Sequence, residues 1–318
     1  MASDPLPLVA GVELGGTKCL AVLARGRTIL RRLRVPTGEA AATLAALSDA
    51  IGEWQRRDGA VAAIGVASFG PIECDRARPG YGTILATPKP GWAGADVRGH
   101  FARRFAVPVG FDTDVAGAAL AEHRWGGGRG ADVLVYLTIG TGVGGGVVVG
   151  GRAVHGLLHP EIGHVRVRRA AGDGFAGLCP FHGDCVEGLV SGPAIAARAG
   201  QAADTLPADH PVWAVVGDEL AELMALLLFI VSPQRILLGG GVGTSRALPL
   251  ARIRARAAAL LNAYPARVDS AELERVIGIA RLGDEAGPLG AVALAHDALA
   301  LSKARFSAPV RPSPRHIR

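Results

Sequence analysis

Metal-capable side chains concentrate in one short stretch, residues 159–188. Two histidines and two cysteines there have the types and spacing of a tetrahedral zinc site, namely His164, Cys179, His182 and Cys185. Because four protein ligands leave no open position for a catalytic water, such a zinc is expected to be structural. Glu161 and Glu187 bracket the ligands. The pattern therefore predicts a metal site whose loop holds two carboxylates at a polar binding site. His155 and His159 are expected to be structural or surface histidines.

Two turns rich in glycine and threonine have the composition of phosphate-binding loops. The first is Gly15-Gly16-Thr17-Lys18, and the second lies within TIGTGVGGG over residues 138–146. Glycines let the backbone approach a phosphate, and backbone N–H groups and Thr hydroxyls can then bind it. The second turn contains G-x-G-x-x-G, but a strand-like segment follows instead of the helix that a dinucleotide fold requires. As a pair the turns suggest a two-sided phosphate clamp; alone, the first is equally an ordinary glycine hairpin.

Two acidic residues stand where an apolar segment gives way to a helical pattern. They are Asp112 and Asp114, within FDTDV over residues 111–115. A carboxylate at such a position can take a proton from a hydroxyl nucleophile, and an aspartate can equally cap the helix. We assign the chemistry to Asp112 and the capping role to Asp114.

The elements that must position these groups occur twice. Residues 7–35 and 131–155 both contain an apolar strand, a glycine and threonine turn, a second strand and a Gly-Arg turn. This duplication predicts an α/β fold of two related lobes with a cleft between them. Helices are expected over 39–57, 96–105, 115–126, 212–231, 246–262 and 287–304, and further strands over 62–70, 107–115, 235–242 and 276–282.

Composition narrows the class of protein. The chain has 318 residues, is 49% hydrophobic, and shows neither a membrane-spanning run nor a secretory signal at its start. Four cysteines are too few for a disulfide framework and fit a reducing cytoplasm. Five of the six net positive charges lie in Lys303, Arg305, Arg311, Arg315 and Arg318. The net charge of the rest of the chain is therefore near zero, which argues against a nucleic-acid partner. The basic tail is interpreted as a frayed end or, alternatively, as a weak anchor for an acidic partner.

Together these motifs resemble those of the ROK family of repressors and sugar kinases, and most of all its zinc-containing bacterial fructokinases. The resemblance covers residues from about 8 to 302 and is carried by GVELGGTK, GVASFGPI, TPKPGW, FDTDV, TIGTGVGGG, HPEIGH, CPFHGDCVEG and LLGGGV. It implies an actin-like ATPase fold, related to ribonuclease H, with two lobes and a cleft. It also implies phosphoryl transfer from Mg-ATP to a hexose, most simply D-fructose to fructose 6-phosphate.

The resemblance also implies roles for individual residues. Asp112 would be the general base. The sugar would meet Gly70, Pro71, Asp112, Glu161, His164 and Glu187. The phosphates would meet Gly15, Gly16, Thr17, Lys18, Thr138, Gly140, Thr141 and Gly142, and the adenosine Gly240 and Gly241. Structural zinc would be held by His164, Cys179, His182 and Cys185. A cytoplasmic homodimer without nucleic-acid or membrane partners is expected.

The implied organisation is a small α/β lobe over residues 1–123 and a larger lobe with the zinc loop over 124–286. A helix at about 287–303 is expected to pack back on the small lobe, and residues 304–318 form a basic, Pro-rich tail.

The sequence departs from the family pattern at three places. Glu13 stands where many members have Asp, so its contact with magnesium is expected to run through water. Ala116 replaces a frequent Asn. The C-x-x-H-x-x-C-x-E run differs from the C-x-C-G-x-x-G-C-x-E run typical of the glucokinase branch. This difference favours a fructokinase over a glucokinase, and the fructokinase could also accept mannose. One alternative is a kinase for glucose or for an N-acylated amino sugar. A less expected alternative is a sugar-responsive repressor without its DNA-binding domain. Because the first strand is expected to begin by about residue 7, no N-terminal helix-turn-helix is expected before it.

Overall fold

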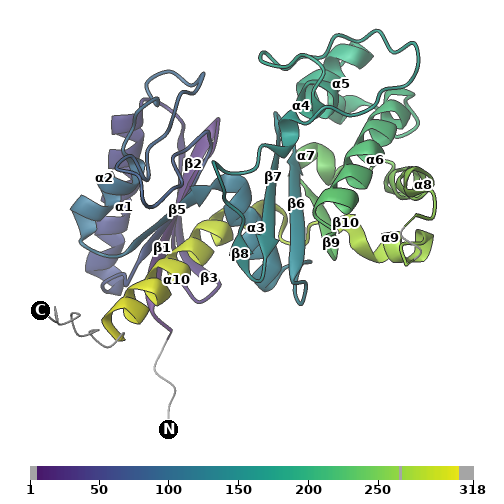
Figure 1. Ribbon diagram of the computed structural model, residues 1–318. Helices are drawn as coiled ribbons and strands as arrows, with labels where there is room; N and C mark the ends of the chain where they lie inside the picture. Colours follow the sequence, from purple (N-terminus) through teal and green to yellow (C-terminus); the bar gives the residue numbers. More distant parts are fainter. Residues whose placement is uncertain (1–5, 265–266, 308–318) are drawn as a thin grey trace, which may run out of the picture.

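Two mixed sheets of five strands each form the framework of the protein (Figure 1). The computed structural model describes residues 6–264 and 267–307. The first sheet has the order β3-β2-β1-β4-β5, with β1 (Leu8–Leu14), β2 (Lys18–Arg25), β3 (Thr28–Pro36), β4 (Ile64–Ser68) and β5 (Val109–Thr113). The second has the order β10-β9-β6-β7-β8, with β6 (Val133–Ile139), β7 (Val143–Val149), β8 (Arg152–Ala153), β9 (Arg235–Gly239) and β10 (Ile277–Ile279).

The two sheets repeat one topology. In each, three successive strands pair antiparallel, and the fourth strand then pairs parallel with the first of the three. The fifth strand pairs parallel with the fourth. Read from the third strand outward, both sheets therefore have the same order. The expected α/β fold of the actin-like ATPase type, with duplicated sheets, is confirmed.

Two helices lie between the sheets and join them. They are α3 (Asp114–Trp125) and α10 (Ala286–Ser307), which pack against each other. Helix α10 contacts β1 and β4 of the first sheet, whereas α3 contacts β6 and β7 of the second. The approach of α10 depends on glycine in β4, because a Cβ on Gly65 would lie 2.0 Å from the Ala291 carbonyl oxygen.

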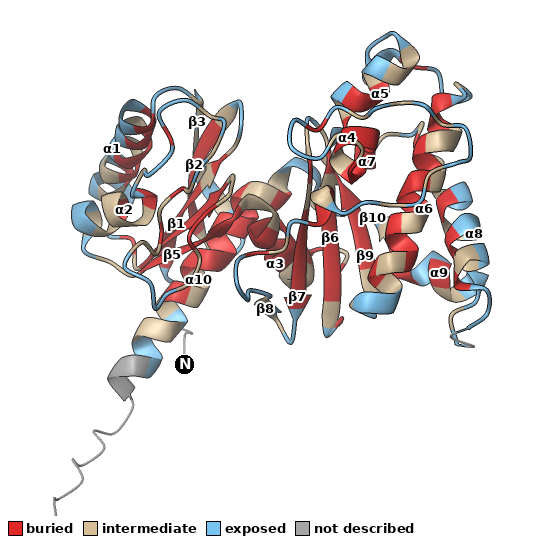
Figure 2. Ribbon diagram, turned by 45° about the horizontal axis from the view of Figure 1, so that its top comes forward, coloured by how far each residue is buried: buried red, intermediate tan, exposed pale blue. Residues whose placement is uncertain are grey.

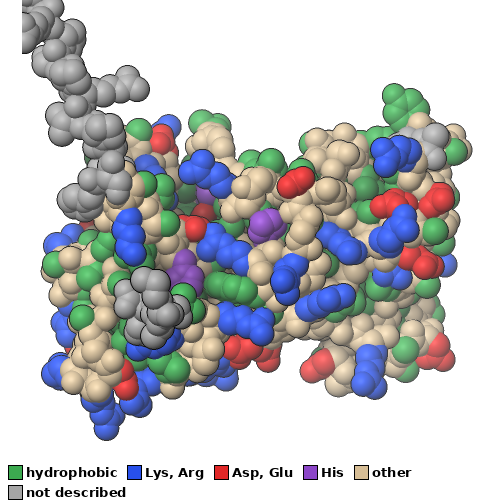
Figure 3. All heavy atoms as spheres, turned by 90° about the horizontal axis from the view of Figure 1, so that it is seen from below, with side chains coloured by type: hydrophobic (Ala, Val, Ile, Leu, Met, Phe, Trp, Pro, Cys, Tyr) green, Lys and Arg blue, Asp and Glu red, His purple; other side chains and the backbone are tan. Residues whose placement is uncertain are grey.

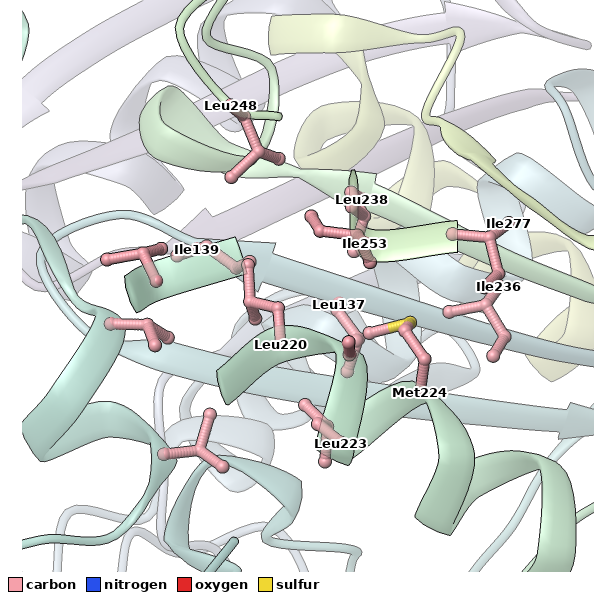
Figure 4. Packing of buried hydrophobic residues seen from close by; sticks show 14 of the residues in the cluster. Leu137, Ile139, Leu220, Leu223, Met224, Ile236, Leu238, Leu248, Ile253 and Ile277 are labelled. Carbon is pink, nitrogen blue, oxygen red and sulfur yellow. The ribbon is translucent and has the colours of Figure 1, made fainter. Parts of the chain in front are cut away.

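The outer faces of the sheets are covered by amphipathic helices. On the first sheet these are α1 (Ala40–Asp58) and α2 (Val97–Phe105), seen with their buried sides inward in Figure 2. On the second sheet α6 (Val212–Ile230), α8 (Leu250–Leu261) and α9 (Ser270–Val276) do the same. Figure 4 shows Leu220, Leu223 and Met224 of α6 facing Leu137 of β6 and Ile236 of β9. Burial of this apolar surface is the main force that holds each lobe together.

Several helix and strand ends differ from the sequence expectation. The strand expected over 235–242 ends at Gly239, and the next residues form the short helix α7 (Gly240–Gly243). Gly240 has φ 77°, a conformation that favours glycine and breaks the strand. The boundary expected at residue 123 falls inside α3, and the helix expected to end near 303 continues to Ser307. The rest of the predicted tail lies outside the described residues.

The surface carries charges of both signs. Figure 3 shows basic and acidic side chains scattered over both halves of one face. Among the described residues, no helix combines the length and apolar character that crossing a membrane requires.

Candidate active site

Two cavities lie between the lobes and share part of their walls. The first, called here the Gly240 cavity, has a volume of about 230 Å³. The second, the Glu161 cavity, has a volume of about 450 Å³. Asp114, Val115 and Thr138 line both cavities. A group bound in one cavity is therefore adjacent to a group bound in the other, with Asp114 at the junction.

The Gly240 cavity is built from the ends of both sheets. Its walls include Glu13 and Lys18 from the first sheet, Thr138 from β6, and Gly240 and Gly241 from α7. Of the first glycine turn, Lys18 lines this cavity, whereas Gly15, Gly16 and Thr17 form the tight turn before it and line neither cavity. Glycine is required at position 240, because a Cβ there would lie 2.5 Å from the Ile139 carbonyl oxygen. Glycine thus allows the start of α7 to approach the end of β6 closely.

A cation would fit the acidic end of the Gly240 cavity. Glu13, Asp114 and Asp284 all line it, and carboxylate oxygens are the ligands that Mg²⁺ prefers in proteins. Glu13 Oε2 is buried and has no hydrogen-bond partner among the described residues. Burial raises the pKa of Glu13, with Lys18 and Arg32 opposing the change. A buried carboxylate oxygen without a partner is costly on its own, so its chemistry suits a cation or its hydration water.

The Glu161 cavity brings together most of the residues expected to meet a sugar. Gly70 and Pro71 of the first lobe line one side, and Glu161, His164 and Glu187 of the second lobe line the other. Gly140, Thr141 and Gly142 of the second glycine turn lie in the same wall. The cavity thus presents carboxylate and imidazole groups for hydroxyls next to a backbone turn suited to phosphate.

Glu187 ties the metal-capable segment to the second glycine turn. It lies in α4 (Val186–Val190), which begins directly after Cys185. Its Oε2 accepts a hydrogen bond from the Val143 backbone N–H at 3.0 Å. A Cβ on Gly142 would come within 2.7 Å of the same oxygen. Glycine at 142 therefore allows Glu187 to rest on the turn, and one carboxylate oxygen remains for a ligand.

The four expected metal ligands converge. The ligand atoms of His164, Cys179, His182 and Cys185 all lie within 4.8 Å of one another. Cys179 Sγ lies 3.7 Å from Nδ1 of both His164 and His182, and Cys185 Sγ lies 3.6 Å from His164 Nδ1. Zinc bond lengths to sulfur and nitrogen give a tetrahedral edge of about 3.6 Å, so the donor set fits that metal.

The surrounding backbone fixes this cluster. Cys179 and Gly183 exchange two backbone hydrogen bonds across a tight turn, and the Val186 N–H donates to the Val165 carbonyl. Burial, with the neighbouring Cys179 thiol, raises the pKa of Cys185 to about 11. A coordinated metal reverses that tendency, because metal-bound thiols are deprotonated. Four converging donor atoms of these types could hold a metal ion.

Asp112 lies in another cavity, apart from these groups. The residue is buried, with its side chain 7% exposed, and it lines a space together with Arg76, Arg152 and His155. Its Oδ1 accepts from the Thr113 N–H at 2.7 Å and pairs with His155 Nε2 at 2.9 Å. That pairing raises the pKa of His155. Asp112 is absent from the walls of both the Gly240 and the Glu161 cavity, so the structure does not bring it to the expected sugar site.

Asp114 has the position and environment that were expected of Asp112. The capping role assigned to it belongs to Thr113, whose hydroxyl accepts from the Ala116 N–H at 3.1 Å. Burial raises the pKa of Asp114 to about 7, and the charges of Glu13 and Glu161 add to the effect. A carboxylate with such a pKa is suited to proton transfer near neutral pH. Its place two residues after Asp112 was visible in the sequence, but the start of the helix decides which carboxylate faces the cleft.

Comparisons with known proteins identify the family of the chain. Residues 9–298 match the ROK family. The chain is 42% identical to the fructokinase of Zymomonas mobilis subsp. mobilis over 290 residues, covering 89% of this chain and 95% of that one. It is 38% identical to the fructokinase of Pediococcus pentosaceus over 293 residues, covering 92% and 99%. The solved ROK family glucokinase of Streptomyces griseus in complex with glucose and AMPPNP superimposes with a TM-score of 0.69 at 25% identity, covering 91% of this chain and 99% of that one.

Proposed function

The chain belongs to the ROK family, and on that premise we propose that it is an ATP-dependent hexose kinase whose preferred substrate is D-fructose. The product would be fructose 6-phosphate. The observation that carries the proposal is the meeting of two cavities at Asp114, one with the features of a nucleotide site and one with those of a sugar site. The fructokinase relatives support fructose over other hexoses.

In this proposal the Gly240 cavity holds ATP. Gly240 and Gly241 would lie beside the adenosine, and Lys18, Thr138 and the backbone of Gly140 beside the phosphates. Glu13 and Asp284 would hold magnesium or its water ligands. When bound, magnesium neutralises charge on the β- and γ-phosphates. The solved glucokinase with AMPPNP supports a nucleotide in this fold.

The sugar would lie in the Glu161 cavity. Glu161 and Glu187 would accept hydrogen bonds from its hydroxyls, and Gly70 and Pro71 would cover its other side. His164 would contribute twice, since its Nδ1 faces the thiols and its ring also lines the cavity. When bound at that cluster, zinc would supply a structural crosslink that holds Glu161, His164 and Glu187 in place.

We assign the general base to Asp114 in place of Asp112. The Asp114 carboxylate would accept the proton of the attacking sugar hydroxyl. The new bond would form between that oxygen and the γ-phosphorus, while the bond to the bridging oxygen breaks and ADP leaves. Charge neutralisation and orientation supply most of the rate in such transfers, and the base contributes on the order of 10²–10⁴-fold.

A coupled ADP-release assay with a panel of hexoses tests the proposal. Fructose is expected to give the highest kcat/KM, with mannose and glucose lower. ADP release that only an N-acylated amino sugar stimulates would replace fructose by that substrate class. No sugar-dependent ADP release with any hexose would overturn the kinase assignment. The homodimer and the cytoplasmic location stay predictions, and light scattering of the purified protein tests the first.

A further inference from the structure

His159 occupies a contact between the two lobes that its sequence position does not reveal. Its side chain is buried and lies in the segment that leads to Glu161. His159 Nε2 is 3.2 Å from the Ile72 backbone N–H, which belongs to the first lobe. His159 Nδ1 is 3.3 Å from Glu161 Oε1. The imidazole therefore joins the loop after β4 to a carboxylate of the Glu161 cavity.

These two contacts fix the tautomer of the ring. The Ile72 N–H can only donate, so Nε2 must be the unprotonated, accepting nitrogen. The proton of the neutral ring then resides on Nδ1, the nitrogen that faces Glu161 Oε1 at 3.3 Å. Because Nε2 is bonded to the Ile72 N–H and Nδ1 faces Glu161, neither nitrogen is directed to a sugar hydroxyl, although His159 lines the cavity.

Glu161 needs such a partner because its side chain is 49% exposed. A free glutamate side chain at a cavity mouth samples several rotamers, and holding it in one costs binding energy. The Nδ1 atom of His159 faces Oε1 at 3.3 Å, close enough to attract that oxygen electrostatically and leave Oε2 for a ligand. The ring in turn rests on the first lobe, since a Cβ at Gly70 would lie 3.3 Å from His159 Cε1.

We propose that His159 is a positioning residue for sugar recognition, which orients Glu161 relative to the Gly70–Pro71 turn across the cleft. This inference rests on the proposed kinase function. It assigns His159 no contact with substrate and no proton transfer. Substitution of His159 should therefore raise the KM for the sugar, and only while Glu161 is present.

The test is a double-mutant cycle with His159→Gln and Glu161→Ala, measured by ADP release with the sugar that the unaltered protein phosphorylates best. The Gln side chain places an acceptor near the Nε2 position and so keeps the bond from Ile72, while the donor to Glu161 is lost. We expect His159→Gln to raise the sugar KM about 2- to 10-fold, the range of one freed side chain, with the KM for ATP unchanged. In the Glu161→Ala background, the same change should have no further effect.

A second variant separates positioning from stability. His159→Asn keeps a donor near Nδ1 but loses the acceptor for Ile72, so it should lower the melting temperature while its sugar KM stays nearer to that of the unaltered protein. The inference is overturned if His159→Gln leaves the sugar KM unchanged, or if its effect persists in full without Glu161. Absence of turnover in the unaltered protein would instead count against the kinase proposal itself.

Discussion

The two halves of the molecule share a strand order but differ after the third strand. In the first half, β3 has nine residues and the chain passes almost directly into α1. In the second half, β8 has only two residues, and a long segment follows before α6 begins at Val212. That intervening segment carries His159, Glu161, the metal-capable cluster and Glu187.

The repeated sheets and the segment inserted in the second half contribute to different cavities. The repeated strands and their turns supply Glu13, Lys18 and Thr138 to the Gly240 cavity. The segment found only in the second half supplies Glu161 and Glu187 to the Glu161 cavity. Changes to the framework should therefore alter the binding of nucleotide or magnesium, and changes to the inserted segment should alter the binding of the sugar. A change at Asp114 should alter the rate of phosphoryl transfer between the two.

The largest effect is expected at the junction. Asp114→Asn should lower kcat on the order of 10²–10⁴-fold, because the amide cannot accept the hydroxyl proton. Asp112→Asn is the matched control, since it makes the same change two residues away in a different cavity. Its kcat should stay within about threefold of the unaltered protein. A reversal of the two results in steady-state kinetics would return the base to Asp112.

A framework change should act on magnesium. Glu13→Gln removes the charge of the buried carboxylate whose Oε2 has no partner. The concentration of magnesium that gives half-maximal rate should rise about 10- to 100-fold, as for changes to groups around a metal's ligands, with little change in the sugar KM. Glu285→Gln serves as control, because that exposed carboxylate pairs with Arg32 outside the cavity. Equal effects of the two changes would remove the proposed cation site.

A change in the inserted segment should act on the sugar. On the proposal that the cluster holds zinc, Cys185→Ser or treatment with a chelator should raise the sugar KM about tenfold, equivalent to 1.4 kcal/mol of lost binding, with the KM for ATP nearly unchanged. Cys74→Ser is the control, since that thiol lies outside the metal cluster. Metal content by elemental analysis should fall only in Cys185→Ser. An unchanged sugar KM in the metal-free protein would disconnect the cluster from the substrate.

The smallest effect is the loss of rate at neutral pH itself, which is about twofold relative to the plateau at higher pH. The base must be ionised to act, and burial raises the pKa of Asp114 from 3.8 to about 7. The protonated, inactive form therefore predominates below that pH. Relative to its plateau at higher pH, kcat/KM for the sugar should be halved near pH 7 and fall about tenfold per unit below it. A profile that stays flat down to pH 5 would show that no such carboxyl group controls the reaction.

Much of this architecture follows from the sequence. The repeated turns predicted the duplicated sheets, and the cysteine and histidine spacing predicted a cluster that the structure brings together. The sequence pattern did not indicate whether Asp112 or Asp114 enters the cleft as the proposed general base. Both stand near the end of β5, but α3 begins at Asp114 and Thr113 provides the cap. The chain direction changes there, so strand alternation no longer tells which side chain enters the cleft.

The role of His159 was also hidden, for a different reason. Its partner Ile72 lies 87 residues away in the other lobe, and only the packing of the lobes brings the two together. Sequence spacing indicates contacts within one helix, strand or turn, whereas contacts across a cleft depend on the relative placement of both sheets.

The most direct test of the central claim is isothermal titration calorimetry of Asp114→Asn with AMPPNP and with fructose. The account predicts that each ligand binds with an affinity close to that of the unaltered protein, while turnover is lost, because Asp114 lies between two separately formed sites. Loss of binding of either ligand, or binding together with near-normal turnover, would contradict it.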